Sequence, residues 1–355
     1  MSGFWSGKRV LITGHTGFKG SWLSLWLSEL GAELFGIALE PEERVLFDVL
    51  DLPSRMMHSI LDIRDADRLY SRVVEIDPDI VFHLAAQPLV IDGYHRPLET
   101  FDTNVLGTAN LLNALRDARK PRAIVCVTTD KVYKNREWEF GYREEDTLGG
   151  HDPYSASKAA AELVAASYGS SFFHGDSQVR IATARAGNVI GGGDMSANRL
   201  VPDIARSLSR GQPLALRHPT AARPWQHVLD PLNGYITLAE ALYDDKERTL
   251  PTAFNFGPDR DAEETVAQLV RVASNTWKMD WPITEVESAY HETERLMLNT
   301  DRAARVLNWS PRWGFEQSVA ATMSWYKARF EDASFDAELF TLSQIGSFRR
   351  ENHTA

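Results

Sequence analysis

Short apolar runs alternate with amphipathic stretches along the first half of the chain. The apolar runs predict buried strands at 9–13, 33–38, 59–62, 80–85, 123–129 and 179–184. The stretches between them predict helices at 20–30, 65–76, 99–118 and from Pro153 onward. Strands rich in valine, isoleucine and leucine, each separated by a helix, are typical of a parallel sheet with helices on both faces. The pattern therefore predicts a doubly wound α/β fold.

The rhythm loosens after the glycine run at 191–193. Beyond it the pattern predicts helices at 200–209, 231–243, 263–275 and 315–330, with isolated short strands such as 253–256. We interpret residues 1–190 as a Rossmann domain to which later segments can return, and 191–330 as a smaller mixed α/β part that binds the substrate. Residues 331–355 lack a strong pattern, and we expect them to form a loosely attached tail.

Composition limits the partners more than the fold. The 355 residues are 43% hydrophobic and 25% charged, which is ordinary for a globular protein. A formal charge of −11 opposes nucleic-acid binding, which needs a basic surface. Cys126, the only cysteine, cannot form an intramolecular disulfide, and its apolar strand favours a buried spectator over a nucleophile. With a polar start and no apolar window long enough to span a bilayer, we expect a cytoplasmic protein without a membrane partner.

A glycine-rich loop, Thr13-Gly-His-Thr-Gly-Phe-Lys-Gly20, opens a helix directly after the first strand. Gly14 would let the chain turn, Gly17 would let the backbone approach a pyrophosphate, and Gly20 would allow close helix packing. Such a loop alone is also an ordinary strand-to-helix turn, but its place between a buried strand and an amphipathic helix favours dinucleotide binding. We therefore predict an NAD site in the 1–190 domain, with contacts from Gly14, Thr16, Gly17, Phe18 and Gly20.

Further cofactor contacts are predicted where the next strands end. Glu40 follows the second strand, where it would hold a ribose hydroxyl and favour NAD over NADP, or would be an exposed loop residue. Asp62 and Ile63 follow the third strand as a candidate adenine clamp. The fourth strand ends in Leu84, Ala85 and Ala86, small residues against which a cofactor could lie closely.

Tyr154 and Lys158 lie four residues apart after Pro153, a preferred first helical residue, so both side chains project from one face. A tyrosine with a pKa of about 10 is a poor base at neutral pH, but an adjacent ammonium and an oxidised nicotinamide would stabilise the phenolate. Such a pair can take a hydroxyl proton while hydride leaves the carbon. The alternative is a surface pair on an ordinary helix, and the Rossmann-like half that precedes it favours the catalytic interpretation.

Taken in order, these motifs resemble the extended short-chain dehydrogenase/reductase family over residues 8–328. The resemblance rests on the glycine loop, Asp62-Ile63, the run 84–87, Thr129 and Tyr154-x-x-x-Lys158. Nucleotide-sugar 4,6-dehydratases of this family carry an acidic pair after the threonine, whereas here Asp130 is followed by Lys131. The Thr-Asp-Lys sequence, with the segments 138–144, 148–150, 152–155, 185–194 and 223–228, resembles the CDP-glucose branch of these dehydratases.

The resemblance implies a hydro-lyase that uses bound NAD with no net redox change. C4 of CDP-D-glucose would be oxidised, water lost from C5 and C6, and hydride returned to C6, giving CDP-4-dehydro-6-deoxy-D-glucose. Tyr154 would take the C4 hydroxyl proton with support from Lys158, while Thr129 would hydrogen-bond the C4 oxygen. Lys131 would then take the C5 proton and Asp130 would protonate the leaving hydroxyl, which needs a neutral lysine beside a protonated aspartic acid. An Asp130–Lys131 ion pair that serves only structure is the alternative.

Substrate contacts are expected at Gln87, Asn188, Arg223 and His291. Asn188 follows a strand end, where open α/β sheets expose ligand-binding loops. The guanidinium of Arg223 suits diphosphate oxygens, although a surface salt bridge is the alternative. Neither histidine and cysteine pairs nor carboxylate clusters occur with metal-ligand spacing in the sequence, so no metal is predicted.

Several functions remain open from the sequence. A nucleotide-sugar 4-epimerase would use Tyr154 and Lys158 but leave Asp130 and Lys131 without a chemical role. A 4,6-dehydratase for another NDP-hexose is a second alternative, because Ile91-Asp92 and Met297-x-Asn299 depart from the family pattern. A non-catalytic NAD-binding regulator is the third. The helices predicted at 99–118 and 153–168 carry enough apolar positions to form a homodimer seam, as in relatives, or to face the sheet.

Overall fold

The computed structural model describes residues 3–41, 45–120, 122–175, 177–196, 199–216, 219–259, 264–279, 283–285 and 295–351. Its centre is a seven-stranded sheet in the order β11-β6-β5-β4-β1-β2-β3, in which all neighbouring strands are parallel. The strands are β1 (Arg9–Thr13), β2 (Glu33–Ala38), β3 (Met57–Ile60), β4 (Ile80–His83), β5 (Ala123–Val127), β6 (Arg180–Arg185) and β11 (Ala253–Asn255). This topology confirms the doubly wound α/β fold.

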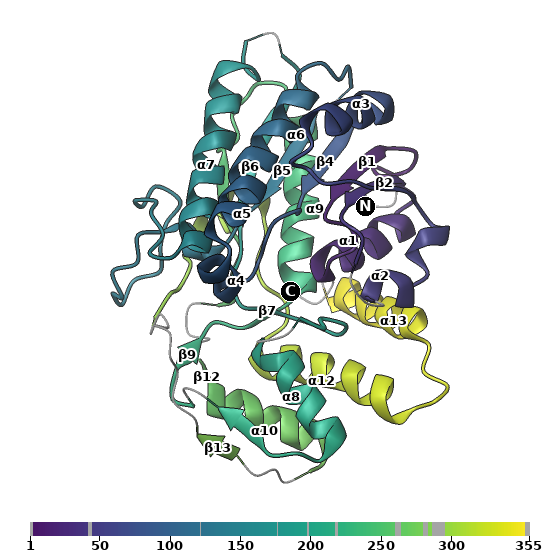
Figure 1. The fold of residues 1–355 in the computed structure, drawn as a ribbon, viewed down its shortest axis with the longest axis vertical. Coiled ribbons are helices and arrows are strands. Elements are labelled where there is room, and N and C mark those ends of the chain that lie inside the picture. Colours follow the sequence, from purple (N-terminus) through teal and green to yellow (C-terminus); the bar gives the residue numbers. More distant parts are fainter. Residues whose placement is uncertain are drawn as a thin grey trace.

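Helices cover both faces of the sheet (Figure 1). One face packs against α1 (Phe18–Glu29) and α9 (Leu229–Asp244), and the other against α3 (Ala66–Ile76), α6 (Gly107–Leu115) and α7 (Pro153–Ser171). Successive strand residues point to opposite faces, so Val10 and Ile12 of β1 join the first core cluster and Leu11 joins the second. Because both clusters are fully buried, the strands are apolar on both sides, which produces the continuous runs seen in the sequence.

The chain leaves the sheet after β6 and then returns to it. α9 packs against β5 and β6, and β11 pairs with β6 as the edge strand. The intervening and following segments form a smaller part, which lies below the sheet in Figure 1. It contains α8 (Leu200–Arg210), α10 (Val266–Trp277), α12 (Phe315–Glu331) and the strand pairs β8 (Leu214–Leu216) with β13 (Ile283–Glu285) and β9 (Ala222–Arg223) with β12 (Glu264–Thr265). β7 (Val189–Ile190) pairs with β10 (Gln226–His227).

The remaining elements are short, except for the last helix. They are α2 (Leu46–Val49), η1 (Leu52–Ser54), α4 (Val90–His95), α5 (Pro97–Phe101), η2 (Asp102–Leu106), η3 (Asp130–Val132), α11 (Asp301–Leu307) and α13 (Ala337–Arg350). The single helix predicted at 99–118 is interrupted by one π-helical turn, η2, between α5 and α6. In the part of the chain that the structure describes, no helix combines the length and apolarity needed to cross a bilayer.

The C-terminal segment differs from the predicted loose tail. Asp336 caps α13 by accepting a hydrogen bond from the amide of Leu339 over 3.0 Å. The buried ring of Phe348 packs edge-on against Trp26 of α1 and Trp313, with centroids 5.8 and 5.4 Å apart. The segment is therefore a docked helix. The sequence pattern hid it because polar residues such as Gln344 share the buried face of α13 with its apolar side chains.

Candidate active site

A cavity of about 650 Å³ lies at the carboxyl ends of the central strands. Parallel strands all end at one edge of their sheet, so the fold brings together loops that are far apart in sequence. The lining includes residues 14 and 16–20 after β1, 38–39 at the end of β2, 61–63 after β3, 84–86 after β4, 127–131 after β5 and 186–191 after β6.

The glycine loop leaves no room for larger residues. Gly14 has a φ of +76°, and a Cβ there would lie 2.7 Å from the amide nitrogen of Ala85. A Cβ on Gly20 would lie 2.2 Å from the carbonyl oxygen of Gly14. Gly14 and Gly20 therefore bring backbone close to the cavity at the first turn of α1, where the residues between them at 16–19 also line it. Such a surface fits the diphosphate of a dinucleotide.

Asp62 and Ile63 line the same cavity beyond the glycine loop. The carboxyl of Asp62 accepts hydrogen bonds from the amide and from Nη2 of Arg64, over 2.9 and 2.6 Å. These bonds, chiefly the one from the guanidinium, lower the pKa of Asp62. Leu84, Ala85 and Ala86 complete this side of the lining. Glu40 is exposed and lies outside the described cavity lining.

Tyr154 and Lys158 both reach the cavity from the first two turns of α7. Lys158 Nζ donates a hydrogen bond to the carbonyl oxygen of Val127 over 2.9 Å, and burial lowers the Lys158 pKa to about 8. Burial raises the Tyr154 pKa to about 12, while the hydrogen-bonding hydroxyl of Thr129 acts in the opposite direction. The protein alone thus shifts the phenol away from ionisation. The lowered pKa of Tyr154 that we expect from the sequence therefore needs the positive charge of an oxidised nicotinamide as well.

Asp130 lies at the centre of a set of polar contacts at the end of β5. Its Oδ1 accepts a hydrogen bond from the hydroxyl of Thr129 over 2.8 Å, and its Oδ2 accepts one from Nδ2 of Asn188 over 3.4 Å. Lys131 Nζ lies 3.5 Å from Oδ1. The Asp130 side chain is 2% exposed and that of Lys131 is 33% exposed. The lysine can therefore reach a ligand in the cavity while it stays paired with the carboxylate.

Two of the expected substrate contacts, Gln87 and Arg223, lie outside the described cavity lining. Gln87 is used within the protein, because its Nε2 donates to Thr100 Oγ1 over 2.8 Å and its Oε1 accepts from the amide of Leu89 over 2.6 Å. Arg223 lies on β9, opposite Glu264 of β12, and is outside the lining formed by the described residues. His291 falls outside the described residues. Of the four, Asn188 alone is among the described residues that line the cavity.

Three charged residues in the lining were given no role from sequence: Lys19, Asp194 and Arg199. Arg199 Nη1 pairs with Asp194 Oδ2 over 2.9 Å, and the Asp194 side chain is buried. The sequence signal for Lys19 was a long cationic residue inside the glycine loop, between Phe18 and Gly20.

A buried ion pair supports the strand ends beneath the site. Glu162, one turn after Lys158 on α7, pairs with Arg185 Nη2 over 2.7 Å, and both side chains are almost fully buried. Thr128 and Thr183 donate hydroxyl hydrogen bonds to the same carboxylate over 2.5 and 2.6 Å. This group ties α7 to β5 and β6, so the helix that carries Tyr154 is fixed relative to the segment that carries Asp130.

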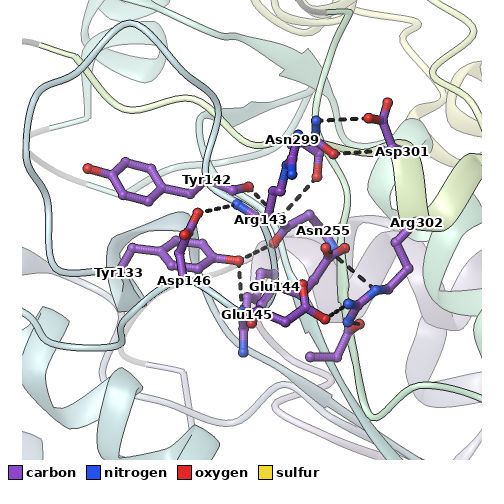
Figure 2. Close-up of polar contacts among 12 residues, drawn as sticks. Tyr133, Tyr142, Arg143, Glu144, Glu145, Asp146, Asn255, Asn299, Asp301 and Arg302 are labelled. Carbon is purple, nitrogen blue, oxygen red and sulfur yellow. Dashed lines mark hydrogen bonds and ion pairs between the residues drawn. The ribbon is translucent and has the colours of Figure 1, made fainter.

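A second polar network anchors the loop that follows Lys131 (Figure 2). The hydroxyl of Tyr133 donates a hydrogen bond to Asn255 Oδ1 over 2.7 Å. The backbone amide of Asn255 donates one to Glu144 Oε1 over 2.9 Å. Asn255 Nδ2 donates to the carbonyl oxygens of Tyr142 and Asn299, over 2.8 and 3.1 Å. The network connects the loop to β11 and to the segment before α11. The buried ion pair therefore fixes the chain before Asp130, and this network fixes the chain after it.

The described residues contain no group of three or more histidine, cysteine or acidic side chains placed to hold a metal ion. The described lining of the cavity offers a phenol, three lysines and three aspartates, a set that is suited to moving protons on a polar ligand.

Comparisons with known proteins agree with this geometry. The model of the GDP-mannose 4,6 dehydratase family matches residues 11–322. A CDP-glucose 4,6-dehydratase of Salmonella typhimurium is 46% identical over 335 residues, 92% of each chain. A solved UDP-glucose-4-epimerase of Stenotrophomonas maltophila with bound NAD superposes with a TM-score of 0.80 at 22% identity, over 92% of this chain and 100% of that one. A solved dTDP-glucose 4,6-dehydratase of Bacillus anthracis in complex with NAD superposes with a TM-score of 0.75 at 23% identity. The match covers 90% of this chain and 96% of that one.

The two solved structures share the fold seen here. The family model and the Salmonella relative go further, because they cover most of the chain and confirm the predicted resemblance to nucleotide-sugar 4,6-dehydratases. This chain belongs to the GDP-mannose 4,6 dehydratase family.

Proposed function

We propose that the protein is a lyase that converts CDP-D-glucose to CDP-4-dehydro-6-deoxy-D-glucose and water. The observation that carries the proposal is the 46% identity, over 92% of both chains, to the CDP-glucose 4,6-dehydratase of Salmonella typhimurium. The geometry supports it, because Thr129, Asp130, Lys131, Tyr154 and Lys158 all line one cavity.

The first proton transfer is assigned to Tyr154. Its phenol and the Thr129 hydroxyl lie side by side, so both can hydrogen-bond the C4 oxygen of the hexose. Lys158 is fixed by its bond to Val127 and adds positive charge behind the phenol. Tyr154 takes the C4 hydroxyl proton, and the resulting ketone acidifies the hydrogen on C5.

The elimination of water is assigned to Asp130 and Lys131. Lys131 takes the proton from C5, and Asp130 protonates the C6 hydroxyl, which leaves as water. The 3.5 Å ion pair between these side chains must give way to a neutral lysine and a protonated aspartic acid when substrate binds.

The glycine loop and the strand ends fit NAD. We assign its diphosphate to Gly14, Thr16, Gly17, Phe18 and Gly20, its adenosine to Asp62 and Ile63, and its nicotinamide half to Leu84, Ala85, Ala86, Tyr154 and Lys158. When bound, NAD supplies a hydride acceptor for C4 and a donor for C6. Asn188 is the substrate contact that the cavity supports, since it adjoins Asp130.

Mass spectrometry after incubation with CDP-glucose tests the proposal. A product lighter by one water supports the lyase. An isobaric product would indicate a 4-epimerase, and no turnover would indicate a protein that only binds NAD. The same assay with dTDP-, GDP- and UDP-hexoses would reveal a dehydratase with another nucleotide preference.

We also propose that the protein acts as a homodimer in the cytoplasm. Large apolar side chains are exposed on neighbouring helical segments: Leu98 on α5, Leu106 on η2 and Leu163 on α7 are 79%, 56% and 61% exposed. α5 and η2 both pack beside α7, so these residues form a surface that a second copy could cover. Sedimentation of a Leu106→Asp, Leu163→Asp variant should reveal a monomer.

A further inference from the structure

Lys19 is the third lysine that lines the cavity. It lies in the first turn of α1 and lines the cavity with Lys131 and Lys158. Lys158 donates to Val127 and Lys131 pairs with Asp130, whereas Lys19 makes no hydrogen bond or ion pair with any described residue. The amine nitrogen keeps contact with solvent in the cavity, where a ligand can replace water as its acceptor.

The charged groups that act on Lys19 line the same cavity as its side chain. It interacts electrostatically with Asp130 and Asp194, which attract it, and with Arg199 and Lys158, which repel it. Asp194 is already paired with Arg199, and Asp130 with Lys131. Burial, and to a smaller extent the positive charge of Arg199, lowers the pKa of Lys19 to about 7. Lys19, Asp130 and Lys158 line one cavity, and the last two belong to the proposed catalytic group, which favours a place for the amine near the hexose.

We propose that Lys19 is a further catalytic residue, whose ammonium donates a hydrogen bond to the C6 oxygen as that oxygen leaves beside Asp130. The inference rests on the proposed function, which assigns Asp130 to the same oxygen. Lys131 takes the C5 proton, the electron pair of the C5–H bond forms the C5–C6 double bond, and the C6–O bond breaks. The oxygen takes its proton from Asp130 and departs as water. Lys19 transfers no proton and stabilises the negative charge that develops on the oxygen and then on Asp130.

Two substrates separate this role from a purely structural one. CDP-6-deoxy-6-fluoroglucose loses fluoride, which leaves without being protonated and depends less on a hydrogen-bond donor than hydroxide does. Lys19→Met and Lys19→Arg should be compared with the native protein on both substrates. Lys246→Met, at an exposed lysine in the turn after α9, serves as the control for loss of one positive charge. Bound NAD, released by denaturation and quantified, gives a readout that is independent of turnover.

Lys19→Met should keep its NAD and lose roughly 100-fold or more in turnover of CDP-glucose, as expected for one donor to a developing oxyanion. The loss with the fluoro substrate should be at least about tenfold smaller, and Lys19→Arg should recover part of the rate. During turnover of CDP-glucose, reduced nicotinamide should accumulate in Lys19→Met, because oxidation at C4 still proceeds while elimination is slow.

Equal losses on both substrates, unchanged turnover, or a loss explained by missing NAD would each overturn the assignment. If Lys19→Met does not fold, Lys19→Gln removes the same charge with a polar side chain and is judged by the same criteria. Failure of the proposed function looks different, because the native protein itself would then release no water from CDP-glucose.

Discussion

Gly187 and Asp130 are packed so closely that only glycine fits beside this carboxyl group. A Cβ on Gly187 would lie 1.9 Å from Asp130 Oδ2. The residue after Gly187, Asn188, has a φ of +52° and donates to the same oxygen. The end of β6 is therefore shaped around the carboxyl that follows β5, although the two segments are more than 50 residues apart in sequence.

Gly187→Ala should therefore displace Asp130 without removing it. We expect turnover to fall by roughly 100-fold, since about 1 Å of misplacement can lower a rate that much, while NAD content stays unchanged. Gly257→Ala is the matched control, because its Cβ would make only an ordinary 3.4 Å contact with Leu298. Steady-state rates and NAD content measured on both variants check the prediction. Equal rates for Gly187→Ala and native protein would contradict it.

Tyr154→Phe removes the proposed base but keeps the ring. Turnover of CDP-glucose should fall by roughly 10²- to 10⁴-fold, and no reduced nicotinamide should appear, because the block precedes oxidation. NAD content should stay at the native level, which separates loss of chemistry from loss of cofactor. Rapid absorbance measurements after mixing with substrate check this. A burst of reduced nicotinamide at the native rate would remove Tyr154 from the assignment.

Asp130→Asn and Lys131→Met test the two halves of elimination separately. Both should still oxidise C4, so reduced nicotinamide should accumulate, and each should lose roughly 10²- to 10⁴-fold in product formation. In heavy water, Lys131→Met should also stop deuterium from entering at C5, whereas Asp130→Asn should not. Undiminished deuterium incorporation in Lys131→Met would refute its role as the base.

Glu162→Gln should destabilise the fold more than any single change at an exposed ion pair. It leaves the buried guanidinium of Arg185 without its counter-charge, which we expect to lower the free energy of unfolding by about 3–5 kcal/mol. Glu331→Gln breaks the half-exposed pair with Lys327, whose atoms are 3.9 Å apart, and should change it by at most about 1 kcal/mol. Urea unfolding of both variants measures the difference, and similar small effects would contradict the assigned role of the buried pair.

Stability should fall as pH drops below about 6.5, the ordinary histidine value. Burial lowers the pKa of His15 to about 4 and those of His83 and His227 to about 3, so the unfolded chain binds more protons in this range. Burial raises the Asp230 pKa to about 7, which acts in the opposite direction between about pH 4 and 7.

Near pH 5 the three histidines add about three protons to the unfolded chain and Asp230 adds about one to the folded protein. The difference of about two protons corresponds to about 3 kcal/mol per pH unit. Urea unfolding at several pH values measures this slope. In Asp230→Asn the slope of unfolding free energy against pH should become steeper by the equivalent of about one proton, because the opposing carboxyl group is absent. Stability that is flat between pH 5 and 6.5 would show that these histidines do not titrate as described.

The sequence by itself determined the sheet, because its strands are buried on both faces and therefore read as apolar runs separated by amphipathic helices. It also indicated the glycine loop and the Tyr154-x-x-x-Lys158 spacing, since both depend on local backbone geometry: a turn after a strand, and one helical turn. These features belong to segments of fewer than ten residues, within which local physics fixes the relative positions of side chains.

Only the tertiary structure decided which polar side chains face the cavity. Gln87 adjoins the lining residues in sequence, yet its amide is used by Thr100 and Leu89. Lys19 appeared to be part of a turn, yet it lines the same cavity as Asp130, more than 100 residues away in sequence. A polar side chain turns toward whichever partner satisfies it, and those partners come from distant segments. Their identity follows from packing of the whole chain, which no local pattern encodes.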